Sequence, residues 1–114
     1  MKTDKTEAQM RKGILEMVIL SIISEKEAYP SDIIRALKKS ELIVVEGTLY
    51  PLLSRLRKSE LLDYTWREST SGPPRKYYYL TEDGLAFLTK LISSWKSMVS
   101  SVDRILENLE KQNE

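Results

Sequence analysis

Apolar residues recur at helical spacing in the first forty residues of the chain. Between residues 5 and 24, large aliphatic side chains return every three or four positions, which predicts a helix with one buried face. A second, shorter helix is expected to begin at Pro30, because proline suits the first position of a helix, and to end near Lys38 and Lys39. Residues 42–45, LIVV, are mostly β-branched and predict a short extended segment before the next helix.

The stretch EGTLYPLLSRLRKSELL, residues 46–62, predicts a third helix with an unusual beginning. Its leucines at 49, 52, 53 and 56 form one stripe, and the opposite side gathers Gly47, Pro51, Ser54 and Lys58, flanked by Tyr50 and Arg55. Two starts fit this pattern. If Thr48 is the N-cap, Pro51 falls in the first turn; if the helix begins earlier, Pro51 crowds the carbonyl of Gly47. Glycine and proline together predict a slim, slightly bent helix tip that fits a groove.

The second half of the chain predicts a hairpin and one long helix. LLDYTWRES and RKYYYLT are rich in aromatic and β-branched residues and predict two strands, separated by a TSGPP loop. Thr81 is suited to cap a final helix over about 82–110, with Glu82 and Asp83 in its first turn. Apolar residues of that helix step by three and four as in a coiled coil: Leu85, Leu88, Ile92, Trp95, Val99, Val102, Leu106 and Leu109.

The order of these elements predicts a mainly α fold with a small β-hairpin wing. Residues 1–80 are expected to form a winged helix-turn-helix domain, and residues 81–114 a C-terminal dimerisation helix. A helix of this length cannot be covered by the small remainder of the chain, so its apolar stripe is expected to contact a second copy.

Composition narrows the possible chemistry. The 114 residues contain no cysteine and no histidine, which excludes disulfides and removes the commonest general base and metal ligand. No nucleophile and base motif and no glycine-rich phosphate loop is present, so neither an enzyme nor a bound cofactor or metal is expected. The longest apolar run is too short to span a membrane and no signal peptide is evident, which predicts a cytoplasmic protein.

The charge distribution points weakly to nucleic acid. The net charge is only +1, but residues 28–80 contain nine basic and six acidic residues, while residues 81–114 contain four and six. On the exposed side of the third helix, small residues permit close approach to bases and basic residues reach phosphates or guanine edges. The candidate DNA contacts are Thr48, Tyr50, Ser54, Arg55 and Lys58 in the helix, with Arg75 and Lys76 in the wing. The alternative is an amphipathic surface helix whose basic residues only keep it in solution.

EGTLYPLLSRLRKSELL followed by RKYYYLTEDG resembles the PadR-like family of bacterial transcriptional regulators, and AYPSDIIRAL at 28–37 adds weaker agreement. The resemblance covers residues from about 14 to 95. It implies a homodimeric winged-helix repressor of the short class, which binds a dyad site in a promoter. Three positions depart from the family pattern: Val45 in place of a small polar cap, Arg57 in place of an acidic residue, and Glu60 in place of a closing glycine, which would deprive that turn of its usual left-handed residue.

The resemblance also implies a role for Trp95, because some members of the short class bind flat, apolar, often cationic compounds against a tryptophan of the final helix. Trp95 is therefore either a stacking plate for such a ligand or an apolar residue of the dimer interface. Asp103 is not obviously near enough to attract a cation. Trp66 and the tyrosines at 29 and 77–79 are expected mainly to pack. Two other functions stay open: a winged-helix module that binds protein, and a ligand-binding protein without a DNA site.

Overall fold

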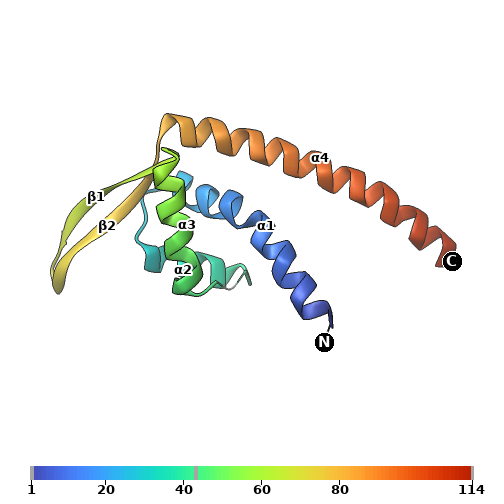
Figure 1. The fold of residues 1–114 in the computed structure, drawn as a ribbon, viewed down its shortest axis with the longest axis horizontal. Coiled ribbons are helices and arrows are strands. Elements are labelled where there is room, and N and C mark those ends of the chain that lie inside the picture. Colours follow the sequence, from blue (N-terminus) through green and yellow to red (C-terminus); the bar gives the residue numbers. More distant parts are fainter. Residues whose placement is uncertain (1, 43, 114) are drawn as a thin grey trace.

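Four helices and one hairpin make up the fold in a computed structural model of the chain, which describes residues 2–42 and 44–113. Their order is α1 (Lys2–Glu25), α2 (Pro30–Lys39), α3 (Glu46–Lys58), β1 (Leu62–Ser69), β2 (Gly72–Leu80) and α4 (Glu82–Asn113). The mainly α fold with a hairpin wing is thus confirmed. Figure 1 shows the hairpin projecting to one side of a small helical body, from which α1 and α4 extend as diverging arms.

The core lies where α1, α2 and α3 meet the base of the hairpin. Its fully buried side chains are aliphatic residues from each of these elements: Ile19, Leu20, Ile33, Leu37, Leu49, Leu53 and Leu62. They come from the apolar stripes that the spacing predicts, because one face of each helix must leave water for the domain to fold. The opposite face of α3 is left free.

The two strands pair antiparallel, and their side chains alternate between two faces. Leu62 lies opposite Leu80, Tyr64 opposite Tyr78, and Trp66 opposite Lys76 on the same face. The predicted loop is shorter than expected, since β2 already begins at Gly72. Proline is tolerated there because a two-stranded sheet consists of edge strands.

The short strand expected at residues 42–45 is not formed by its described residues, and Ile43 lies outside the described part of the chain. Val45 does have an extended backbone, with φ −86° and ψ 158°. The third segment that joins the hairpin is instead Ala28, which exchanges two backbone hydrogen bonds with Tyr78 at 2.9 and 3.1 Å.

Helices α2 and α3 are each followed by a turn that contains a glutamate in a left-handed conformation. Glu41 and Glu60 both have φ 64°. After α3, the N–H of Leu61 donates to the carbonyl of Leu56 at 3.0 Å and the N–H of Glu60 to that of Arg57 at 2.9 Å, the hydrogen bonds of a Schellman motif. The expectation that this turn lacks its left-handed residue is therefore wrong: Glu60 takes that conformation without being glycine.

The start of α4 is attached directly to the end of α3. The Thr81 hydroxyl donates to the carbonyl of Glu60 at 2.7 Å and accepts from the N–H of Gly84 at 2.9 Å, which confirms Thr81 as the cap. The N–H of Thr81 donates to the carbonyl of Leu61 at 3.2 Å. A Cβ on Gly84 would overlap that same Leu61 carbonyl, so only glycine fits at this joint.

The apolar stripe of α4 divides into two parts. Leu88 is buried in the core of its own chain, with Leu91 and Ile92 packed beside it. Further along, the large apolar residues are exposed in the single chain: Trp95, Met98, Val102, Ile105, Leu106 and Leu109. The division of the chain at residues 80 and 81 stays a prediction.

Candidate nucleic-acid interface

Helix α3 begins at Glu46, so the earlier of the two predicted starts is the one observed. Its N-cap is Val45, which offers no side-chain hydrogen bond, and Pro51 lies inside the helix with Gly47 four residues before it. Gly47 has open space around it. The tip of α3 is therefore exposed and narrow.

The exposed side of α3 contains the predicted contact residues. Thr48, Tyr50, Ser54, Arg55 and Lys58 are all exposed, while the leucines at 49, 53 and 56 are buried. The structure thus brings the five candidates together on one free surface. Polar and basic side chains along such a helix are what the major groove accepts, since bases present donors and acceptors at its floor.

Each edge of this surface is bordered by another element. On one edge, the Arg55 guanidinium donates to the Glu16 carboxylate of α1, an ion pair that the sequence pattern does not reveal. Thr48 shares a groove on that side with Ala8, Arg11 and Lys12 of α1.

The hairpin forms the other edge. Arg57 donates from Nε to Asp63 at 3.2 Å, and its guanidinium lies 4.5 Å from the ring centroid of Tyr64. Two hydrogen bonds hold the pKa of Asp63 below its ordinary value: the larger effect comes from the N–H of Tyr64 and the smaller from Arg57. The hairpin is therefore held at a fixed place beside α3.

The two predicted wing cations lie on aromatic rings. The Arg75 guanidinium is 5.2 Å from the ring centroid of Tyr29, and the Lys76 ammonium is 4.5 Å from that of Tyr64 and 5.5 Å from that of Trp66. These contacts restrict the long side chains while leaving their charged ends near the surface. Within the described residues, neither cation is ion-paired to a carboxylate.

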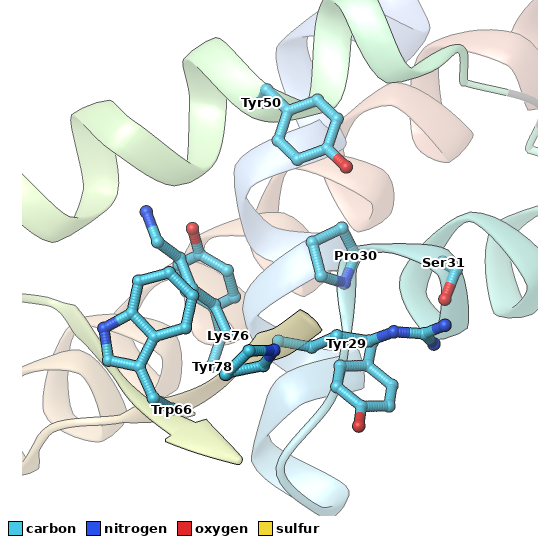
Figure 2. Close-up of a pocket in the computed structure, with 9 residues that line it drawn as sticks. Tyr29, Pro30, Ser31, Tyr50, Trp66, Lys76 and Tyr78 are labelled. Carbon is cyan, nitrogen blue, oxygen red and sulfur yellow. The ribbon is translucent and has the colours of Figure 1, made fainter. Parts of the chain in front are cut away.

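Trp66 is exposed, although it was expected to pack. Its side chain is 61% exposed and faces a cleft of about 530 Å³ between α3, the start of α2 and the wing. Tyr78, by contrast, is buried, while Tyr77 and Tyr79 are half-buried. In Figure 2, Tyr50 of α3 lies on one side of this cleft, with Trp66 and Lys76 together on the wing.

Trp95 lies far from this surface, on the part of α4 that leaves the body. It is 39% exposed and lines a shallow groove of about 390 Å³ together with Val99 and Asp103. Asp103 lines the same groove two helical turns further along α4.

Other kinds of site find no support in the described residues. Residues 2–42 and 44–113 hold no cluster of three acidic, histidine or cysteine side chains that suits a metal ion. In the same part of the chain, no helix is long and apolar enough to cross a membrane.

Comparison with known proteins identifies the group to which the chain is similar. Residues 19–90 match the sequence model of the transcriptional regulator PadR-like family. A PadR-like transcription factor from Bacteroides fragilis is 54% identical, with a TM-score of 0.76 over 89% of this chain and 98% of that one. A PadR family regulator from Eggerthella lenta is 31% identical, with a TM-score of 0.85 over 92% of both chains.

Two further relatives extend the likeness. A PadR-like regulator from Bacillus cereus is 40% identical over 86% of this chain and 96% of its own, with a TM-score of 0.77. An uncharacterised protein from Lysinibacillus sphaericus is 31% identical over 87% of this chain and 94% of its own.

Proposed function

The chain belongs to the PadR-like family of transcriptional regulators, and we propose that it acts as a homodimeric repressor of a promoter in the bacterial cytoplasm. One observation carries this proposal: the same chain has a free polar and basic face on α3 and a helix, α4, whose outer half exposes an apolar stripe. The first surface suits DNA and the second suits another copy of the chain.

On DNA, α3 enters the major groove with its narrow tip first. Thr48, Ser54 and Lys58 then face base edges or the nearest phosphates, with Tyr50 and Arg55 at the two sides of the helix. Arg75 and Lys76 contact the backbone from the wing. A dimer presents two such helices to half-sites about one turn apart.

The dimer forms through the exposed half of α4. Exposed apolar residues that follow one another at three- and four-residue spacing match the pattern of helices that pair along their length. An apolar stripe of this length is unfavourable in water, and a second copy supplies the same stripe about a two-fold axis.

Salt-dependent binding to the DNA upstream of its own gene tests the repressor. Affinity should fall steeply with salt, because phosphate contacts release counterions. Lys58→Ala should weaken binding and lower the salt slope by about one. Lys90→Ala, on the outer side of α4, is the matched control and should bind like the wild type. If the wild type shows no preference for that DNA over random sequence, the repressor proposal fails and a protein-binding module becomes the better account.

An effector, where one acts, would bind against Trp95. The two copies of this residue approach each other across the two-fold axis, and a planar cation between them gains from stacking, with Asp103 in the same groove. Binding there would change the separation of the recognition helices. Titration with a planar cationic dye should quench tryptophan fluorescence, and Trp95→Ala should abolish most of that quenching. Quenching that survives Trp95→Ala would place the ligand elsewhere and leave Trp95 as a residue of the interface.

A further inference from the structure

On the face of the hairpin that includes Leu62, Tyr64 and Trp66, the third cross-strand pair differs from the two before it. Leu62 and Tyr78, from the first two pairs, are buried in the core. The third pair, Trp66 and Lys76, lies on the same face but beyond the edge of the core. Trp66 is thereby held open at the surface, although a large aromatic side chain at that register would ordinarily be covered.

The cleft in front of this pair has one consistent chemistry. Aromatic side chains come to it from four segments: Tyr29 before α2, Tyr50 from α3, Trp66 from β1 and Tyr78 from β2. Two cations, Arg75 and Lys76, stand beside them, and no acidic residue lines it within the described part of the chain. A cleft of this kind suits a ligand that alternates apolar surface with negative charge.

The cleft is also continuous with the surface of α3 that is proposed to read DNA, because Tyr50 belongs to both. A sugar–phosphate strand has the required alternation, since each apolar deoxyribose is flanked by phosphates. When α3 lies in the major groove, the strand that borders the groove on the wing side passes this cleft.

We propose that this cleft holds one backbone strand of the DNA duplex, with the indole of Trp66 packed on a deoxyribose and Arg75 and Lys76 on the adjacent phosphates. This inference rests on the proposed DNA-binding function and adds Trp66 to its contacts. Because a backbone contact carries no sequence information, Trp66 strengthens binding to operator and random duplex alike. Its place on a rigid hairpin also sets how far α3 descends into the groove.

Affinity measurements on both kinds of duplex test the proposal. Trp66→Ala should weaken binding to operator and to random DNA by a similar factor, about five- to tenfold, as expected for one buried aromatic contact. Trp66→Phe should retain most of the affinity. Thr65→Ala, whose side chain lies on the other face of β1, is the matched control and should bind like the wild type. Circular dichroism checks that each variant is folded.

Fluorescence gives a second readout that a merely structural role would not produce. The chain has two tryptophans, so the difference between wild type and Trp66→Phe isolates the signal of Trp66. That signal should change when random duplex is added at low salt. Unchanged fluorescence together with full affinity of Trp66→Ala would overturn the cleft proposal and leave the repressor standing. A loss confined to the operator would overturn the backbone assignment in favour of a base contact. Failure of the wild type to bind any DNA would instead refute the proposed function itself.

Discussion

Replacing Glu60 by glycine should stabilise the protein, although it removes a side chain from the end of the recognition helix. Glu60 has φ 64°, a left-handed conformation that costs a residue with a Cβ about 1–2 kcal/mol. Glycine adopts this conformation without that cost but loses about 0.5–1 kcal/mol more in backbone entropy on folding. The net expected gain is therefore about 1 kcal/mol. For a chain of this length, that corresponds to an increase in Tm of roughly 4 °C.

Thermal or urea unfolding at fixed protomer concentration measures this gain, since dimerisation makes the apparent stability depend on concentration. Glu60→Ala is the decisive control. It removes the same carboxylate, which lies in a groove with Glu82 and Asp83, but it keeps the Cβ and with it the backbone strain. It should therefore change the stability little. If Glu60→Ala stabilises as much as Glu60→Gly, the gain comes from charge and the argument from backbone conformation is refuted.

Four further substitutions test contacts and backbone positions elsewhere in the domain. Glu16→Gln removes the carboxylate that competes with phosphate for Arg55 and should raise DNA affinity several-fold, with a salt slope steeper by about one in a binding titration. Folding lowers the pKa of Asp63 from its ordinary value of 3.8, so the ionised carboxylate stabilises the fold above that pH. Asp63→Asn should therefore be less stable than the wild type at neutral pH. That difference should disappear as the pH falls through the lowered value, and a constant difference in acid unfolding curves would contradict it. Gly84→Ala should destabilise by about 1–3 kcal/mol through overlap at the joint, whereas Gly13→Ala, in open space within α1, should stabilise by about 0.8–1.0 kcal/mol in the same assay.

Much of the fold follows from local patterns in the sequence. The helical stripes of α1, α2 and α3 predict their buried faces, and Thr81 is the cap that its position before an acidic first turn suggests. These features depend on residues close in sequence, where spacing alone determines which side chains share a face. The alternation along β2 likewise predicts that one side of its tyrosine run packs on the core, and Tyr78 is the tyrosine on that side.

The features that the sequence does not predict depend on contacts between distant residues. Glu16 and Arg55 are 39 positions apart, and only the packing of α1 beside α3 brings them together. Trp66 lies on the face of the hairpin that packs on the core, but it is exposed because the core ends before it. The spacing of apolar residues along the chain does not reveal where the core ends. The residue that pairs with Tyr78 is Ala28, 50 positions earlier in the chain, and no local pattern identifies it.

The two ends of α3 differ in their surroundings, and the difference suits the proposed function, in which one end contacts DNA and the other is joined to α4. At the tip, Gly47 and Pro51 leave the helix narrow and free of neighbours. At the other end, Thr81 donates hydrogen bonds to the carbonyls of Glu60 and Leu61 and so holds the start of α4 against the turn that follows α3. Figure 1 shows the two ends close together. We propose that a rotation of α4 is passed through this joint to α3, since the close approach of Gly84 to the Leu61 carbonyl leaves little room for independent movement there. The length of α3, 13 residues or about 20 Å at 1.5 Å per residue, then converts a small change of angle at the joint into a displacement of a few ångströms at the tip. A displacement of that size would remove contacts to base edges, so the proposed regulation through α4 requires no additional hinge.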